Sequence, residues 1–332
     1  MSSRSSFDPP SDQDWMAAAA RLAARARPLS SPNPGVGALL VKDNRLIARG
    51  WTQPGGRPHA EAGLLDSAGK GAAGATLYVT LEPCAHESQR GPACSDLVAK
   101  ARPSRAVIGQ LDPDPRTSGA GIARLKRAGI DSAVLEDAAS AASLAGYLTR
   151  QKLGRPHVTL KLAVSLDGCI ALSDGTSQWI TGEHARAHVH AHRARHEAIL
   201  VGGSTWRSDR PRLDVRIPGL EERSPRRILL SRGVAPEGVT VINRPDQIGA
   251  LEGVQYLYVE GGAQTAASFL AEDLVDELHL YRAPIIIGDG LHGIGALGLT
   301  GEAGLASAHK RWTLAERRQL GSDEFTAYQR TR

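Results

Sequence analysis

The sequence predicts an α/β protein built from two domains, and three observations support this. The chain has 332 residues, and a single hydrophobic core seldom organises a chain of that length. In both halves, short apolar runs alternate with helical stretches, as in sheets covered by helices. A Gly154-Arg155-Pro156 break separates the halves. We therefore place a first domain at residues 12–150 and a second at 155–332.

The first half is predicted to begin with a helix over residues 12–27, because its Ala-rich run favours helix and Asp12 can cap it. Two apolar runs around Lys42-Asp43-Asn44 predict a β-hairpin over 36–41 and 45–50. Helices and strands then alternate in a βαβαβ order. We expect helices at 59–69, from Cys94, at 122–129 and at 138–156, and strands at 75–81 and 106–111.

The second half shows the same alternation. A strand is expected over 157–168 and another over 197–203, with a His- and Arg-rich helix at 183–196 between them. Further apolar segments lie at 226–232, 239–243, 256–262, 276–288 and 311–330, and a helix is expected at 263–270. No repeat of solenoid or propeller length is present.

Composition excludes several classes of protein. No apolar run approaches the ~20 residues of a membrane helix, and residues 1–15 have no hydrophobic segment and predict a disordered lead-in without a secretory signal. Three cysteines suit a reducing compartment, so we expect a cytoplasmic protein without disulfides. The net charge of +5 suits anionic partners. The charge alone does not choose between phosphorylated small molecules and nucleic acid, but the absence of long Lys/Arg blocks argues against a nucleic-acid-binding tail.

A set of potential metal ligands lies between His59 and Cys94. His59-Ala60-Glu61 and Pro83-Cys84, followed by Cys94, match the ligand and acid set of zinc nucleobase deaminases. His59, Cys84 and Cys94 supply the three protein ligands of a catalytic Zn²⁺ and leave one position for water. Glu61 is then free to transfer protons as the catalytic acid/base. Cys84 and Cys94 flank a turn before a predicted helix, where thiolates are favoured.

Two alternatives remain for this motif. His86 could be a fourth ligand, as in a structural zinc site with four protein ligands. A nucleic-acid deaminase is also conceivable, but its signature has two residues between the cysteines, whereas Cys84 and Cys94 are ten positions apart.

The first half resembles the deaminase domain of the bifunctional riboflavin-biosynthesis deaminase/reductases, which has a cytidine-deaminase-like α/β/α fold. The matching runs are Trp15-Met16, SPNPGVG at 31–37, His59-Ala60-Glu61, TLEPCAH at 80–86 and DPDP at 112–115. The resemblance implies that Asn33 contacts the base or ribose and that Asp112 lies near the substrate. The segment 88–94 is one residue longer than is usual in the family, so a substrate contact by Arg90 stays open.

In the second half, no G-x-G-x-x-G follows a strand, which argues against an ordinary Rossmann site. Two glycine-containing segments, 201–205 and 259–265, instead follow predicted strands where a helix is expected to begin. Their backbone N–H groups could bind phosphate. Each could equally be a tight turn without a ligand.

These turns and other runs resemble the reductase domain of the same family, which is dihydrofolate-reductase-like and uses NADPH. The runs are KLAVSLDG at 161–168, SQWIT at 177–181, GST at 203–205, LDVR at 213–216 and EGG at 260–262. The resemblance implies a cofactor site formed by Ala163, Trp179, Thr205, Asp209, Gly262, Ala263, Gln264, Thr265, Ala266, Ala267 and Ser268. It implies substrate contacts from Ser177, Leu213, Arg216 and Glu260, and Arg216 suits a ribose phosphate.

Three residues depart from that family. Cys169 stands where Lys or Arg is frequent, Arg210 where an acidic or amide residue is common, and Asp214 where Thr is common. In the helix at 183–196, His184/His188 and His188/His192 have the i, i+4 spacing of metal ligands. Because arginines alternate with these histidines, we predict an exposed cationic face there instead of a metal site.

Together these features predict a two-step enzyme. A deaminase would convert the 2-amino group of a diaminopyrimidinone ribosylamine phosphate to a carbonyl, and a reductase would deliver hydride from NADPH to C1 of the ribose. The expected partner is this phosphorylated pyrimidine, with no nucleic acid and no membrane. A homo-oligomer is compatible with the sequence but not specified by it. One inactive half, or a zinc-stabilised protein without catalysis, would be the alternatives.

Overall fold

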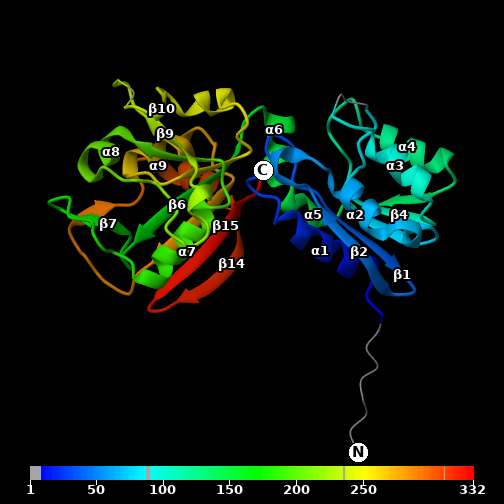
Figure 1. Cartoon of the computed structure of the whole chain (residues 1–332). Coiled ribbons are helices and arrows are strands. Elements are labelled where there is room, and N and C mark those ends of the chain that lie inside the picture. The colour runs from blue at the N-terminus through cyan, green and yellow to red at the C-terminus, as the bar shows by residue number, and fades with distance from the viewer. Residues whose placement is uncertain (1–8, 87–89, 235, 310) are drawn as a thin grey trace, which may run out of the picture. The chain divides into compact units, whose positions relative to one another are not determined.

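The computed structural model describes residues 9–86, 90–234, 236–309 and 311–332. It confirms the α/β fold, with sheets and helices in each half of the chain (Figure 1). The chain divides into two compact units between Leu153 and Gly154. Among the described residues, no helix combines the length and apolarity needed to cross a membrane.

A five-stranded sheet forms the centre of the first unit. The strand order is β2-β1-β3-β4-β5; β1 is antiparallel to both neighbours, whereas β3, β4 and β5 are parallel. The strands are β1 Gly37–Lys42, β2 Arg45–Trp51, β3 Thr76–Leu81, β4 Arg105–Gln110 and β5 Asp131–Val134. The hairpin and the next two strands were predicted. The edge strand β5 was missed, because four residues, one exposed and three half-buried, give too short a pattern.

Helices cover both faces of this sheet. They are α1 Asp12–Ala23, α2 Ala60–Ala68, α3 Cys94–Ala101, α4 Ala120–Arg127, α5 Ala138–Ser143 and α6 Ala145–Leu153, with short 3-10 turns η1 Pro54–Gly56 and η2 Gly69–Ala72. Residues of α2, α3 and α4 share a core with β1 and β3, including Leu40, Leu64 and Leu77. On the other face, Met16 of α1 packs against Leu39 and Tyr78.

The prediction that Asp12 caps the first helix was wrong. Ser11 is the cap: its hydroxyl accepts a hydrogen bond from Asp14 N at 3.2 Å, and its own N–H donates to Asp14 Oδ2 at 2.8 Å. The Asp12 carboxylate instead pairs with Arg105 of β4 at 2.7 Å. Residues 1–8, where most of the disordered lead-in was expected, lie outside the described residues.

The second unit contains an eight-stranded sheet of order β10-β9-β8-β11-β6-β12-β15-β14. It is parallel except at β15, which is antiparallel to β12 and β14. The strands are β6 His157–Val164, β8 Ala198–Gly202, β9 Arg226–Leu230, β10 Thr240–Ile242, β11 Tyr256–Val259, β12 Glu277–Arg282, β14 Trp312–Leu320 and β15 Asp323–Arg330. A separate ribbon pairs β7 Cys169–Leu172 with β13 Gly290–His292.

Helices also cover both faces of this sheet. They are α7 Glu183–Arg193, α8 Gly203–Asp209, α9 Ala263–Ala271 and α10 Gly301–Ala308, with 3-10 turns η3 Glu221–Arg223 and η4 Pro245–Ala250. Phe269 of α9 packs with Leu160 and Leu257 on one face. On the other face, Val189 of α7 packs with Tyr281 and Phe325.

The predicted exposed cationic face of the helix at 183–196 was wrong. His188 and His192 lie against the sheet: the ring centroids of His188 and Phe325 are 4.6 Å apart, and those of His192 and His279 are 4.4 Å apart. Burial lowers the pKa of His192 well below its ordinary value, so its imidazole is neutral at neutral pH. His188 and His192 therefore belong to an aromatic layer under α7, a role that their spacing in the sequence did not reveal.

Candidate active sites in the two domains

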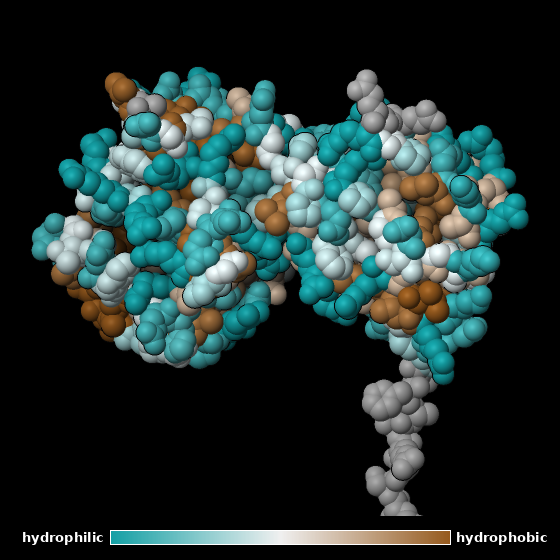
Figure 2. Space-filling view, in the orientation of Figure 1, coloured by the Kyte–Doolittle hydropathy of each residue, from teal (hydrophilic) through white to brown (hydrophobic). Residues whose placement is uncertain are grey.

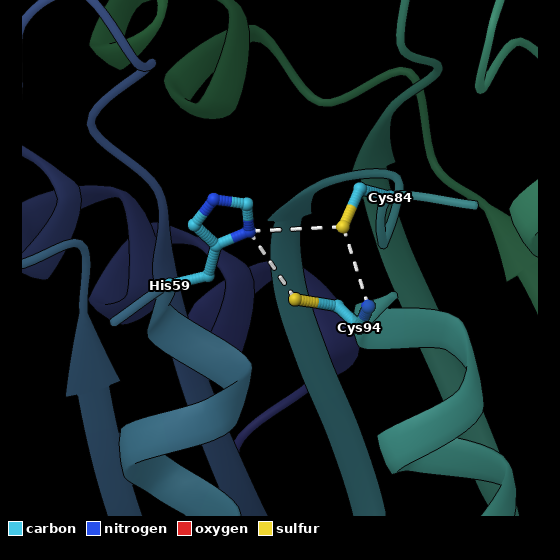
Figure 3. A group of neighbouring side chains, drawn as sticks. All are labelled: His59, Cys84 and Cys94. Carbon is cyan, nitrogen blue, oxygen red and sulfur yellow. Dashed lines mark hydrogen bonds between the residues drawn. The ribbon is translucent and has the colours of Figure 1, made fainter. Parts of the chain in front are cut away.

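His59, Cys84 and Cys94 converge at one point in the first unit (Figure 3). Nδ1 of His59 lies 3.7 Å from the Cys84 sulfur and 3.3 Å from the Cys94 sulfur. His59 immediately precedes α2, Cys84 follows β3, and Cys94 is the first residue of α3. The three ligand atoms thus come from three elements that the βαβ order brings to one edge of the sheet.

This geometry fits a zinc ion. In a tetrahedral site with Zn–N bonds of about 2.0 Å and Zn–S bonds of about 2.3 Å, nitrogen and sulfur ligands lie about 3.5 Å apart. The two measured N–S distances, 3.7 and 3.3 Å, lie on either side of that value. All ligand atoms of the set lie within 4.8 Å of one another. In the described part of the chain, three side chains converge here, which is the number of a catalytic zinc site.

The surroundings of the Cys84 and Cys94 thiols shift their pKa values. A hydrogen bond with Cys94, and then one with His59, lowers the pKa of Cys84 to about 4. The Cys94 backbone N–H, at the start of α3, also donates to the Cys84 sulfur at 3.2 Å. A hydrogen bond with Cys84, together with burial, raises the pKa of Cys94 well above its ordinary value. Cys84 is therefore favoured as a thiolate, which is the form that binds a metal.

Glu61 lies in the first turn of α2 and is 3% exposed. Burial raises its pKa to about 7, although the nearby His59 opposes this shift. A carboxyl group with that pKa can both accept and return a proton near neutral pH, which suits a catalytic acid/base. The prediction for Glu61 thus has a physical basis in its burial beside the ligand set.

Asn33 contacts the outer edge of the His59 ring. Its Nδ2 lies 3.2 Å from His59 Nε2 and donates to the Gly56 carbonyl at 2.9 Å. Gly56 has a φ of +80°, and a Cβ there would lie 2.7 Å from the Asn33 side chain, so this position requires glycine. Asn33 is therefore fixed beside a metal ligand, and its contact with the substrate base stays a prediction.

Asp112 is held at the end of β4 by hydrogen bonds that the sequence did not reveal. Its Oδ1 accepts from the Tyr147 hydroxyl at 2.7 Å and from Asp114 N at 2.9 Å. Burial raises the pKa of Asp112, and the Tyr147 bond opposes that shift. The buried Glu82 carboxylate accepts from Asp112 N at 3.3 Å and from Gly119 N at 3.0 Å, which fixes the following loop.

His86 does not join the ligand set. Its Nδ1 lies 3.4 Å from Thr117 Oγ1, and the converging group contains His59, Cys84 and Cys94 without it. This counts against the four-ligand structural site. In the loop between the cysteines, Arg90 donates to the Gly55 carbonyl at 2.8 Å. Ser88 and Gln89 of that loop lie outside the described residues.

In the second unit, the two glycine turns lie side by side. They precede α8 and α9, as predicted. They lie side by side because β8 and β11, the strands that they follow, are neighbouring and parallel. A Cβ on Gly202 would lie 2.2 Å from Thr265 Oγ1, and a Cβ on Gly262 would lie 3.3 Å from Thr205 Oγ1. The predicted cofactor residues Thr205 and 262–268 are therefore brought together at the carboxyl ends of two strands, where α/β sheets bind ligands.

Glu260, a predicted substrate contact, belongs to a buried charged cluster. Arg193 of α7 donates to both Glu260 oxygens, at 2.6 and 2.9 Å, and Lys161 Nζ of β6 lies 3.9 Å away. Burial opposes ionisation of Glu260, but Arg193 and Lys161 outweigh it and lower its pKa to about 2. Burial lowers the pKa of Lys161.

Sequence reasoning missed Arg193, although a signal was present. Arg193 continues the buried stripe of Ala185 and Val189 at four-residue spacing. A cation at such a position requires a buried partner. Arg193 also donates to the Asp214 carbonyl at 3.0 Å, so it connects Glu260 to the segment that carries the other predicted substrate residues.

That segment borders a cavity of about 490 Å³, lined by Arg212, Asp214, Arg216 and four neighbours. The exposed Arg216 side chain lies 3.5 Å from the Asp214 carboxylate. The Leu213 side chain is buried in the core, where Ala163 packs. The two residues are thus placed differently: Arg216 can reach a ligand with its side chain, whereas Leu213 could do so through its backbone.

The remaining predicted residues lie on the periphery. Trp179 is 64% exposed, with the Arg186 guanidinium 4.7 Å from its ring centre. Ser177 is half-buried in the same loop, and Asp209 is exposed at the end of α8. The roles of Trp179, Ser177 and Asp209 in binding stay predictions. Cys169, which departs from the family pattern, is buried in β7.

Comparison with known proteins matches each half of the chain to a known family of domains. A model of the cytidine and deoxycytidylate deaminase zinc-binding region matches residues 9–110, and a model of the RibD C-terminal domain matches residues 156–248 and 246–324. Riboflavin biosynthesis protein RibD of Aquifex aeolicus is 36% identical, with 87% of this chain and 91% of that protein covered. The chain belongs to the RibD family. The Escherichia coli RibD protein is also 36% identical, with 94% and 97% covered.

Solved RibD structures agree with this assignment. One form of Acinetobacter baumannii RibD matches with a TM-score of 0.83 and 34% identity over 97% of this chain and 99% of that chain. A Thermotoga maritima structure, described as a diaminohydroxyphosphoribosylaminopyrimidine deaminase/5-amino-6-(5-phosphoribosylamino)uracil reductase, matches with a TM-score of 0.83 and 29% identity over 96% and 99%. As a RibD-family protein, the chain is a bifunctional enzyme of riboflavin biosynthesis, with a zinc-type deaminase domain before a reductase domain.

Proposed function

We propose that the first domain deaminates 2,5-diamino-6-(5-phosphoribosylamino)pyrimidin-4(3H)-one and that the second reduces the ribosyl group of the product, 5-amino-6-(5-phosphoribosylamino)uracil, to ribityl. The observation that carries this proposal is the convergence of His59, Cys84 and Cys94 beside buried Glu61. The proposed cofactors are Zn²⁺ and NADPH. The partner is the phosphorylated pyrimidine, without nucleic acid or membrane.

In the deaminase step, zinc on the three ligands would supply Lewis-acid activation of water. Glu61, buried beside the ligand set, takes one proton from the water and passes it to the ring nitrogen, and then takes the remaining proton of the added hydroxyl and passes it to the departing amine. The water oxygen becomes the new carbonyl oxygen, and the 2-amino nitrogen leaves as ammonia. Asn33 and Asp112 would position the ring and the ribose.

In the reductase step, NADPH would supply a hydride to C1 of the open-chain ribosyl imine. The side chains of the protein orient the two reactants and place charged groups beside them. Glu260 pairs with Arg193 and Lys161, and the exposed guanidinium of Arg216 lines a cavity that we assign to the ribose phosphate. The two glycine turns would hold the cofactor pyrophosphate.

The three free thiols suit the reducing cytoplasm, which we propose as the location. A homo-oligomer is compatible with this proposal.

Selective metal removal tests the assignment of the two steps. Chelator-treated protein should lose ammonia release from the diaminopyrimidinone and regain it when zinc is restored. The same metal-free protein should still oxidise NADPH when it receives the deaminated product. Ammonia release without zinc would refute the metal assignment. Failure of NADPH oxidation by the zinc-loaded protein would show that one half is inactive.

A further inference from the structure

The segment that carries Arg216 lies outside every helix and strand. Residues 211–216 run between α8 and the turn η3. Backbone N–H and C=O groups in such a segment need partners from side chains or water. One partner is Ser224, whose Oγ accepts from the Val215 N–H at 3.0 Å. Because the Arg216 side chain lines the cavity assigned to the ribose phosphate, whatever holds this backbone also places its guanidinium.

Two side chains of α7 hold the residues on either side of Val215. Figure 2 shows mostly hydrophilic residues on the face of the second unit where α7 lies, but His190 and Arg193 are on the buried side of this helix. Arg193 donates from Nη1 to the Asp214 carbonyl at 3.0 Å. The Arg216 N–H donates to Nδ1 of His190 at 3.2 Å. His190, which is 9% exposed, therefore fixes the backbone of the arginine itself.

The contacts of His190 indicate which ring nitrogen carries its proton. Nδ1 lies 3.1 Å from the Asp214 carbonyl oxygen and 3.2 Å from the Arg216 nitrogen, so it could donate to the first or accept from the second. The Asp214 carbonyl already accepts from Arg193, whereas the Arg216 N–H requires an acceptor. Nδ1 is therefore unprotonated, and Nε2 carries the proton. Burial, and then Arg193 and Arg216, lower the pKa of His190, so its ring is neutral at neutral pH.

We propose that His190 is a positioning residue of the reductase site. Its unprotonated Nδ1 accepts the Arg216 backbone N–H and thereby places the Arg216 guanidinium for the ribose phosphate. This inference rests on the proposed reductase function. Among the described residues, the cavity lining does not include His190, so this residue acts on the ligand through Arg216 and not by contact.

Loss of this acceptor should change binding more than chemistry. The phosphate is on C5 of the ribose, remote from the reacting C1, so Arg216 holds it equally in the ground state and in the transition state. An interaction of that kind affects KM and leaves kcat nearly unchanged. Without an acceptor, the buried Arg216 N–H would move toward water and take the guanidinium out of place. We expect a rise of about 10-fold in KM for the deaminated pyrimidine.

Two substitutions of the same size separate hydrogen bonding from packing. Asn and Leu branch at the same carbon, but only Asn offers an oxygen where His offers Nδ1. His190→Leu should raise KM about 10-fold with kcat within ~3-fold of wild type, whereas His190→Asn should keep both within ~3-fold. His184→Asn makes the same change on the exposed side of α7 and should match wild type. NADPH binding, followed by fluorescence, shows that the second domain is folded in each variant.

Equal increases in KM for His190→Asn and His190→Leu would show that the ring only fills space, and would overturn the proposal. So would a fall in kcat with an unchanged KM. A second measurement decides the matter if His190→Leu does not fold. Nitrogen NMR of protein with isotope-labelled histidines should show the Nε2–H tautomer at His190, with its signal assigned by its loss in His190→Asn. A proton on Nδ1 would contradict the proposal.

Binding of D-ribose 5-phosphate, measured by titration calorimetry, gives the same comparison without turnover. Wild-type protein and His190→Asn should bind it alike, and His190→Leu about 10-fold more weakly. If wild-type protein oxidised no NADPH with the pyrimidine but the variants kept this order of binding, the proposed substrate would fail and the role of His190 would stand. Equal binding by all three proteins, or none by the wild type, would rule that role out.

Discussion

Breaking the Arg193–Glu260 pair should destabilise the second domain strongly. The pair is bidentate, at 2.6 and 2.9 Å, and both side chains are about 10% exposed. The pKa of Glu260 falls from its ordinary 4.5 to about 2 despite burial. At ~1.4 kcal/mol per pKa unit, the surroundings favour the ionised carboxylate by roughly 3 kcal/mol. Arg193→Met should therefore cost about 3–5 kcal/mol of the free energy of unfolding.

A double-mutant cycle measures this coupling. Urea unfolding, followed by hydrogen exchange of β11 amides to isolate the second domain, compares Arg193→Met, Glu260→Gln and the double variant. The double variant should lose clearly less than the sum of the single losses, because no unpaired carboxylate stays buried. Losses that add to within ~0.5 kcal/mol, or a cost of Arg193→Met below ~1 kcal/mol, would refute the reasoning.

The pH dependence of stability has a definite sign. Because the folded pKa of Glu260 lies below its ordinary value, its contribution is complete above pH 4.5 and is lost as the pH falls through about 2. In Arg193→Met, burial raises the pKa of Glu260 instead, so its carboxylate becomes protonated at higher pH. The stability difference between the two proteins should therefore shrink from pH 7 to pH 3.

Three further changes have defined outcomes. Glu61→Gln should keep bound zinc by metal analysis and lower the rate of ammonia release ~10²–10⁴-fold; a loss below tenfold would exclude it as the acid/base. Tyr147→Phe removes the 2.7 Å bond to Asp112 and should cost about 1–2 kcal/mol in thermal unfolding and raise the KM of deamination with zinc retained; an unchanged KM would show that Asp112 is not near the substrate. Gly202→Ala, whose Cβ would lie 2.2 Å from Thr265 Oγ1, should cost about 1–3 kcal/mol, and adding Thr265→Ala should recover part of that loss; no recovery would place the strain elsewhere.

Features that depend on local spacing were predictable from the sequence. His59, Cys84 and Cys94 each lie at the start of a helix or just after a strand, so the predicted βαβ order was enough to place them together. The two glycine turns were predictable for the same reason, because neighbouring parallel strands end at one edge.

Features that depend on packing between distant segments were not predictable. The histidines of α7 looked exposed because arginines alternate with them, yet the sheet buries His188 and His192 among aromatic rings. The bond from Tyr147 to Asp112 spans 35 positions, and that from Arg193 to Glu260 spans 67. Such pairings follow from tertiary structure and leave little local pattern in the sequence.

The most direct test of the two-site account follows ammonia and NADPH separately in one reaction of the wild-type, zinc-loaded protein. With the diaminopyrimidinone alone, ammonia should appear; when NADPH is added, its oxidation should follow and reach one equivalent per ammonia. Ammonia release that requires NADPH, or NADPH oxidation that precedes ammonia, would contradict an account in which deamination and reduction occur in this order at two independent sites.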